Sequence, residues 1–189
     1  MTALVATLLL IAPPPSSTEW SILLQQSFQR QDGTTEYGSV YLPPGYSGDS
    51  SNTYPLLILL HGLGGHDTDW FRDGKLKALF DSAIVQGRLQ PLIVVAPDGG
   101  DGYWTEWVSD AAARYSSLVE PEARLWADRN FRTDGRVAIA GVSMGGFGAL
   151  STALQHPGRF VAVLSFSGAL FRQFPTSRSV YLQAFGYPG

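Results

Sequence analysis

The sequence predicts an α/β fold built on a mostly parallel sheet, with an antiparallel hairpin at the N-terminal side. The continuous apolar run at residues 55–60 is typical of a strand buried on both faces of a parallel sheet, and residues 92–96 and 161–167 indicate further buried strands. Amphipathic stretches with a helical period lie between these runs, and strands that alternate with helices indicate right-handed crossovers. A chain of 189 residues is about the size of one domain.

The composition is that of a globular protein whose surface carries few charges. Hydrophobic residues make up 44% of the chain and charged residues 15%, so a substantial core can form. The net charge of −3, without a basic cluster, argues against nucleic acid as a partner. The chain has no cysteine, which excludes disulfides, a thiolate nucleophile and cysteine metal sites but leaves the compartment open.

The N-terminal residues resemble a secretion signal. The apolar run at residues 4–12 is too short to cross a bilayer as a helix but has the length of a signal-peptide core. We therefore expect a signal peptide and linker over residues 1–18, a domain over residues 19–189, and a secreted or periplasmic protein. No Lys or Arg precedes the run, so a cytoplasmic protein with a disordered or edge-packed N-terminus stays open.

The first half of the domain begins with a hairpin and a strand–helix unit. Residues 20–28 and 37–42 are strand-like and flank a polar turn with an Asp-Gly pair, which predicts an antiparallel hairpin. After the buried strand at 55–60, apolar residues recur with helical spacing from Asp73, and Gly87 marks the end of that helix.

The second half continues the alternation of helices and strands. Residues 111–130 form an amphipathic stretch that we expect to bend or divide at Pro121. A strand at 137–142 leads into a helix at 144–155, and the last buried strand covers 161–167. We expect this last strand to be an unprotected, hydrophobic edge, which favours association of the chain.

The sequence Gly-Val-Ser-Met-Gly at 141–145 lies between the predicted strand and the predicted helix. In that context a G-x-S-x-G sequence forms a nucleophile elbow, a tight turn that strains the serine and requires flanking residues without a Cβ. Ser143 would then lie at the positive end of the following helix, where an oxyanion is stabilised. Without catalysis, the same glycine-rich turn would serve structure alone.

A second glycine-rich loop, His61-Gly62-Leu63-Gly64-Gly65, follows the buried strand at 55–60. In acyl transfer such a loop supplies one oxyanion donor, and the residue after the nucleophile supplies the other. We assign these donors to the backbone N–H groups of Leu63 and Met144. We expect His61 to fix this loop and not to act as the base. A purely structural connection is the alternative reading of the loop.

The residues after Ser143 lack the rest of a triad. Triads of this type follow the chain order Ser, Asp or Glu, His. The 46 residues after Ser143 contain no Asp or Glu, and their one histidine is His156, at the far end of the predicted helix. We therefore expect this chain to be the N-terminal part of a longer enzyme, with the last strands of the sheet missing. A complete protein that has lost catalysis is the alternative.

Seven stretches between residues 41 and 169 carry a resemblance to a known family. They are Tyr-Leu-Pro-Pro-Gly-Tyr at 41–46, Leu-Leu-His-Gly-Leu-Gly-Gly at 59–65 with Trp70, Val-Ala-Pro-Asp-Gly at 95–99, Asn-Phe-Arg-Thr at 130–133, Ala-Gly-Val-Ser-Met-Gly-Gly-Phe-Gly-Ala at 140–149, His-Pro at 156–157 and Ser-Phe-Ser-Gly-Ala at 165–169. Their order resembles the esterase branch of the alpha/beta-hydrolases, which includes S-formylglutathione hydrolases (esterase D), feruloyl esterases and mycolyltransferases. The resemblance implies the alpha/beta-hydrolase fold, Ser143 as nucleophile, and Leu63 and Met144 as the oxyanion hole.

These observations predict a serine carboxylic-ester hydrolase that works through an acyl-enzyme on Ser143. Its substrate would be a small-molecule or carbohydrate-linked ester, and we expect no metal, organic cofactor or stable membrane span. Tyr103, Trp104 and Trp107 follow a strand end where ligands bind, so they either line a substrate pocket or serve packing. An acyltransferase of the mycolyltransferase type and an inactive binding module on the same fold are the rival functions.

Overall fold

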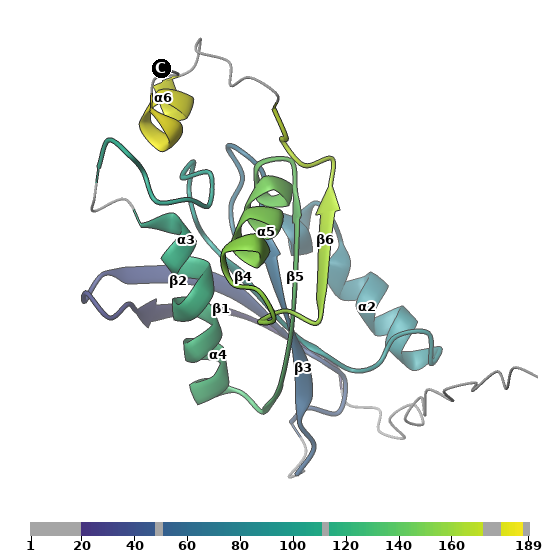
Figure 1. The fold of residues 1–189 in the computed structure, drawn as a ribbon. Coiled ribbons are helices and arrows are strands. Elements are labelled where there is room, and N and C mark those ends of the chain that lie inside the picture. The colour runs from purple at the N-terminus through teal and green to yellow at the C-terminus, as the bar shows by residue number, and fades with distance from the viewer. Residues whose placement is uncertain (1–19, 48–50, 111–113, 172–178, 187–189) are drawn as a thin grey trace, which may run out of the picture.

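The structure is a computed structural model that describes residues 20–47, 51–110, 114–171 and 179–186. The leader and linker predicted for residues 1–18, and the start of the amphipathic stretch at 111–113, lie outside the described residues. Figure 1 shows one central sheet with helices on both of its faces.

The sheet has six strands in the spatial order β1-β2-β4-β3-β5-β6. β4, β3, β5 and β6 are mutually parallel, whereas β1 and β2 pair antiparallel with each other and β2 pairs antiparallel with β4. The predicted mostly parallel sheet with an N-terminal hairpin is therefore confirmed. The strands are β1 (Ile22–Gln29), β2 (Thr35–Leu42), β3 (Tyr54–Leu60), β4 (Ile93–Pro97), β5 (Thr133–Val142) and β6 (Ala162–Phe166).

Helices connect the parallel strands, and one predicted boundary is wrong. The first connection contains α1 (Asp69–Arg72) and α2 (Leu76–Val85), not one helix starting at Asp73. Lys75, between the two helices, has the left-handed φ of 52°, a conformation that an α-helix does not continue through. A spacing of apolar residues cannot reveal this break.

The connection from β4 to β5 divides at Pro121, as predicted. It consists of α3 (Tyr115–Ser117), the π-helical segment η1 (Leu118–Ala123) and α4 (Arg124–Asn130). Glu120 has the extended φ and ψ of −130° and 114°, because the ring of a following proline disfavours the helical conformation. The remaining helices are α5 (Met144–Gln155) and α6 (Ser179–Phe185), of which α6 was not predicted.

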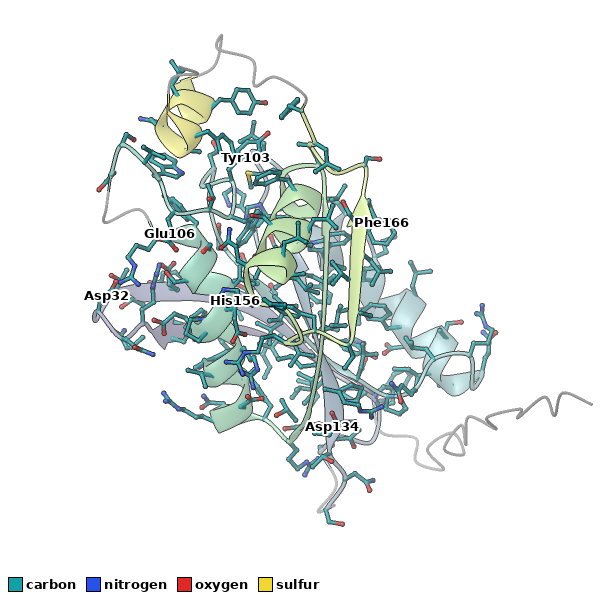
Figure 2. The ribbon with its side chains drawn as sticks, in the orientation of Figure 1. Asp32, Tyr103, Glu106, Asp134, His156 and Phe166 are labelled. Carbon is teal, nitrogen blue, oxygen red and sulfur yellow. The ribbon has the colours of Figure 1, made fainter. Side chains whose placement is uncertain are left out.

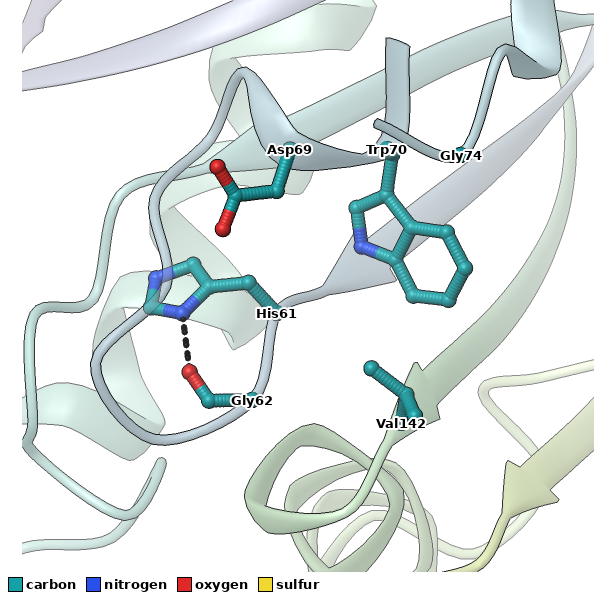
Figure 3. A pocket seen from close by; sticks show the side chains of 6 residues that line it. All are labelled: His61, Gly62, Asp69, Trp70, Gly74 and Val142. Carbon is teal, nitrogen blue, oxygen red and sulfur yellow. Dashed lines mark hydrogen bonds between the residues drawn. The ribbon is translucent and has the colours of Figure 1, made fainter. Parts of the chain in front are cut away.

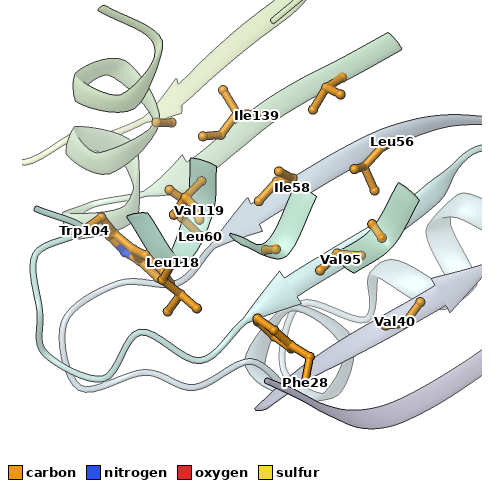
Figure 4. Packing of buried hydrophobic residues seen from close by; sticks show 14 of the residues in the cluster. Phe28, Val40, Leu56, Ile58, Leu60, Val95, Trp104, Leu118, Val119 and Ile139 are labelled. Atoms are coloured by element: carbon orange, nitrogen blue, oxygen red, sulfur yellow. The ribbon is translucent and has the colours of Figure 1, made fainter. Parts of the chain in front are cut away.

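The core has two layers, one on each face of the sheet. On one face, α3 to α5 pack against apolar side chains of the strands, among them Leu56, Ile58 and Ile139 (Figure 4). On the other face, a smaller cluster joins α1 and α2 to the sheet through Phe71 and Ile84. β3 and β4 are covered from both sides, which explains why they read as continuous apolar runs. β6, which was expected to be buried, is instead mostly exposed, because it has a neighbouring strand on one side only among the described residues.

β6 forms an edge of the described sheet, as predicted. It pairs with β5 alone, and the side chains of Val163, Leu164 and Phe166 remain exposed. Among the described helices, none has both the length and the apolar character needed to cross a bilayer.

Candidate active site

Backbone strain concentrates where the parallel strands end. Five non-glycine residues in the described part of the chain have positive φ, and four of them lie in the loops at this edge of the sheet. They are Tyr103, Trp104, Ser143 and Ser167. Strained residues of this kind persist where the surrounding structure holds them, and they cluster at functional sites.

Ser143 occupies a sharp turn between β5 and α5, with φ 54° and ψ −114°. Its N–H donates to the carbonyl oxygen of Phe166 (2.9 Å), and its carbonyl oxygen accepts from Phe147 (3.0 Å) and Ala169 (2.9 Å). The strained turn is therefore held by α5 on one side and by the end of β6 on the other. The residue itself is exposed, so its hydroxyl is presented to solvent at the edge of the sheet.

Two glycines allow the chain to turn this tightly. A Cβ added to Gly141 would lie 2.2 Å from the carbonyl oxygen of Gly145. A Cβ added to Gly145 would lie 2.1 Å from the carbonyl oxygen of Leu60, at the end of β3. Contacts this short with backbone atoms do not occur, so the elbow and the end of β3 can approach only because both residues are glycine.

The loop after β3 runs beside the elbow. A Cβ added to Gly62 would lie 3.7 Å from the Cβ of Ser143. Gly65 donates its N–H to the carbonyl oxygen of Gly62 at 3.0 Å, and Gly64 between them has φ 74°, so residues 62–65 form a tight turn. The structure thus brings the predicted oxyanion loop, which contains Leu63, next to the predicted nucleophile.

His61 is buried beneath this loop, with 1% of its surface exposed. Its Nδ1 lies 2.8 Å from the carbonyl oxygen of Gly62, and its Nε2 lies 3.1 Å from the backbone N–H of Gly99. A carbonyl can only accept, so Nδ1 donates its hydrogen to the Gly62 carbonyl. Both nitrogens are engaged within the loops, which supports a positioning role for His61.

The bond from His61 also orients the predicted oxyanion donor. The carbonyl of Gly62 and the N–H of Leu63 belong to one planar peptide group and point in opposite directions. Because His61 and Gly65 both hold the Gly62 carbonyl, the Leu63 N–H is directed away from them. The other predicted donor, the N–H of Met144, belongs to the first turn of α5, where N–H groups lack partners within the helix.

Asp98 directly follows β4 and lies at the same edge of the sheet. Its carboxylate lies 3.6 Å from Nε2 of His61 and accepts hydrogen bonds from the N–H of Gly100 (3.0 Å) and from Nδ1 of His66 (3.2 Å). The neighbouring His61 first, and then these hydrogen bonds, lower the pKa of Asp98 to about 2, although partial burial opposes the shift. His66 is exposed, as expected for a polar residue of this loop.

Tyr103 and Trp104 are buried, which favours the packing alternative for both. Trp104 has no exposed surface, and its Nε1 donates to the carbonyl oxygen of His61 at 3.1 Å. Its ring also contacts α5 at Gly148, where an added Cβ would lie 2.5 Å from the Trp104 side chain. Tyr103 packs edge-on against Phe147 and against α6.

Trp107 is partly exposed and donates its Nε1 to the carbonyl oxygen of Gly102 at 2.9 Å. It therefore stays a candidate for contact with a substrate. The link from Trp104 to His61 was not foreseen from the sequence. The glycine at position 148, which leaves room for the ring on α5, was its one sequence signal.

His156 lies at the C-terminal end of α5, where its N–H donates to the carbonyl oxygen of Thr152. The 12 residues of α5 separate it from Ser143, which corresponds to about 18 Å along the helix. Figure 2 shows His156 at the end of α5 opposite to Tyr103. It is therefore not a partner of Ser143 in this structure.

A small pocket of about 230 Å³ opens beside the elbow (Figure 3). It is lined by residues of the loop after β3, of α1 and its C-terminal end, and of the strand before Ser143. These residues are His61, Gly62, Asp69, Trp70, Gly74 and Val142. Among the described residues, no three His, Asp or Glu side chains lie together as metal ligands would.

The sequence profile of the family described as "Putative esterase" matches residues 33–178, which is more than half of the chain. The chain belongs to this esterase family. Esterase Rv1288 of Mycobacterium tuberculosis is 41% identical over 143 residues, which cover 69% of this chain and 28% of that protein. An endo-1,4-beta-xylanase/feruloyl esterase of Xylanibacter ruminicola is 32% identical over 136 residues, which cover 68% of this chain and 19% of that protein.

Solved structures show the same fold as this chain. A ferulic acid esterase superimposes with a TM-score of 0.72 and 26% identity, covering 79% of this chain and 61% of the other. An S-formylglutathione hydrolase from Agrobacterium tumefaciens superimposes with a TM-score of 0.63 at 24% identity. The predicted alpha/beta-hydrolase fold and the predicted family are confirmed. The matched segment spans less than a third of the length of the two curated relatives named above.

Proposed function

We propose that the protein containing this chain is a serine carboxylic-ester hydrolase that forms an acyl-enzyme on Ser143. The observation that carries the proposal is the strained, exposed Ser143 at the start of α5, next to the glycine turn at residues 62–65. The hydroxyl oxygen would lose its proton to a base and attack the ester carbonyl carbon, and the N–H groups of Leu63 and Met144 would stabilise the resulting oxyanion. Collapse of this tetrahedral intermediate breaks the ester C–O bond, so the alcohol leaves with a proton and the acyl group stays on Ser143. Each such donor is worth about 3 kcal/mol in the transition state.

The molecule that attacks the acyl-enzyme then determines the reaction class. Attack by water on the acyl group completes hydrolysis, whereas attack by a sugar or another alcohol completes transfer. The relatives named as esterases favour hydrolysis, and a small-molecule or carbohydrate-linked ester is the substrate class that we propose. The base and acid of the reaction are not assigned, because the residues after Ser143 include only His156 at the remote end of α5.

The test is turnover of 4-nitrophenyl acetate by the protein expressed from its complete gene, with and without an added alcohol. We expect Ser143→Ala to lower turnover by about a millionfold, as removal of a catalytic serine does in a comparable triad. Acetic acid should form even when glycerol or trehalose is present. An acetylated alcohol as the main product would establish transfer. Absence of turnover above the uncatalysed rate in wild type and Ser143→Ala alike would support the inactive binding module.

We also propose export of the protein. The apolar run at residues 4–12 carries this proposal, and N-terminal sequencing of the mature protein tests it. Cleavage within residues 12–19 is the expected result, whereas an intact Met1 in the cytoplasmic fraction would contradict export.

A further inference from the structure

The pocket beside the elbow adjoins both predicted parts of the catalytic site. Val142 directly precedes Ser143, and Gly62 begins the turn that contains the Leu63 donor. Ser143 itself does not line the pocket, so a substituent of an ester bound at Ser143 would reach it past Val142 and Gly62. The residues that line the pocket decide which substituents fit.

The size of the pocket restricts its ligand to a small group. A volume of about 230 Å³ lies between an apolar cavity of about 150 Å³ that binds benzene and the range of roughly 300–1,000 Å³ typical of sites for drug-sized molecules. One ring or a short aliphatic chain is enough to fill such a space.

The chemistry of the walls favours a neutral, apolar group. Figure 3 shows the Trp70 ring and the Val142 side chain on two sides of the pocket, and Val142 is 37% exposed there. The lining contains one carboxylate, Asp69, whose two oxygens are already bound by the N–H of His66 and by Arg72. The hydrogen-bonding capacity of this carboxylate is thus partly used within the protein, and the wall that remains for a ligand is apolar at Trp70 and Val142.

We propose that this pocket receives the neutral apolar substituent on one side of the ester carbonyl, and that Val142 and Trp70 set the size of that substituent. This inference rests on the proposed role of Ser143. The substituent belongs either to the acyl group or to the alcohol, and both supply the same small apolar chemistry. Val142 and Trp70 are thus specificity-determining residues of the esterase.

Two series of esters test the proposal with three variants. The first series is 4-nitrophenyl acetate, butyrate, hexanoate and benzoate, and the second is methyl, butyl and benzyl acetate. Val142→Phe fills the pocket from a side chain that is already partly exposed, and Val142→Ala and Trp70→Phe enlarge it. Leu154→Phe is the matched control, because Leu154 is an exposed apolar residue near the remote end of α5.

We expect Val142→Phe to lower the ratio of kcat/KM for the benzoate or the benzyl ester to kcat/KM for the smallest ester of the same series. The ratio should fall by about tenfold or more, since one extra methylene in an apolar pocket already changes kcat/KM by about 10–200-fold. Val142→Ala and Trp70→Phe should shift the preference toward the larger esters. The series that responds identifies the acyl or the alcohol side. Unchanged ratios in both series, or equal changes in Leu154→Phe, would overturn the proposal.

A binding measurement separates this inference from the proposed function. We expect toluene to cause saturable NMR shifts of the Val142 methyl groups in Ser143→Ala protein, and benzoate to cause none. Val142→Phe should abolish saturable toluene binding, measured by saturation transfer to toluene. Toluene binding without Ser143-dependent turnover would reject the proposed function. Ser143-dependent turnover without toluene binding would reject the pocket.

Discussion

Gly145→Ala is the substitution that most sharply probes the contact between the elbow and the oxyanion loop. An added Cβ would lie 2.1 Å from the carbonyl oxygen of Leu60 and 2.6 Å from that of His61. The Cβ and the Leu60 oxygen would have to separate by about 1.3 Å, from 2.1 Å to an ordinary contact of 3.4 Å. Both oxygens belong to the backbone, so α5 and the end of β3 must move apart.

That movement would displace Ser143 from the Leu63 donor. A misplacement of about 1 Å at a catalytic site costs about 100-fold in rate. We therefore expect Gly145→Ala to lower kcat for ester hydrolysis, and the rate of Ser143 phosphonylation, by about 100-fold with little change in KM. It should also lower the free energy of unfolding by about 1–3 kcal/mol, the usual cost of overpacking, although alanine favours a helix by about 1 kcal/mol.

Gly87→Ala is the matched control. Gly87 has φ 66° and ends α2, and an added Cβ there meets no atom within 4 Å. The control should lose about 1–2 kcal/mol through its left-handed conformation and keep its phosphonylation rate. The assay is phosphonylation by a fluorophosphonate, followed by mass spectrometry, together with urea unfolding. A wild-type rate in Gly145→Ala would refute the close approach of α5 and β3.

Four further predictions follow from individual residues. Asp98→Asn removes a carboxylate whose pKa of about 2 lies below its ordinary value of 3.8, and a lowered pKa adds stability above pH 4 that is lost as the pH falls toward 2. Wild type should therefore exceed this variant in free energy of unfolding by about 1–2 kcal/mol at pH 6, after allowance for solvent screening, and the two should converge near pH 2; a constant difference across this range would contradict the assigned pKa. Ser143→Gly should be more stable than Ser143→Ala by about 1 kcal/mol in urea unfolding, because glycine adopts positive φ without strain; equal stability would argue against a strained elbow. Glu120→Ala should cost about 3–5 kcal/mol because the buried carboxylate pairs with Arg124 and Arg159, whereas Arg159→Ala, at an exposed side chain, should cost less than about 1 kcal/mol; the reverse order would show that the pair is not buried. Val163→Lys, at the exposed edge strand, should reduce self-association of the 189-residue chain in analytical ultracentrifugation, and a wild-type chain that is already monomeric would contradict this.

The central parallel strands could be predicted from the sequence because the sheet buries them from both sides. The runs at β3 and β4 are buried and apolar, whereas β6 was identified from its apolar residues although it is mostly exposed. The division of the β4–β5 connection at Pro121 was equally predictable, since the proline ring acts on its own neighbour.

The misjudged helices depend on information that local periodicity does not carry. The break at Lys75 depends on one residue with positive φ. Lysine seldom adopts this conformation, so its presence in the sequence does not indicate a break. α6 is short and is held by contacts with distant aromatics, including the ring pairs of Tyr181 and Phe185 with Tyr103. A seven-residue helix of this kind is stabilised by tertiary packing and leaves a weak pattern in the sequence.

The candidate site was predictable at the positions where a close approach of the backbone requires glycine. Ser143 and the turn containing Leu63 could be identified because a tight elbow and a close loop need residues without a Cβ. The role of Trp104 could not, because an aromatic residue in a loop after a strand packs or binds with the same sequence signature. Its burial against His61 and Gly148 depends on how two loops and α5 meet in space.

The most direct test of the central claim is the covalent labelling of Ser143. The protein expressed from its complete gene would be treated with a fluorophosphonate, digested and analysed by tandem mass spectrometry, with Ser143→Ala as control. The account predicts one phosphonyl group on Ser143 in the wild type and none in the variant. Failure to label folded wild-type protein that binds toluene in its pocket, or labelling of another residue instead, would contradict Ser143 as the nucleophile.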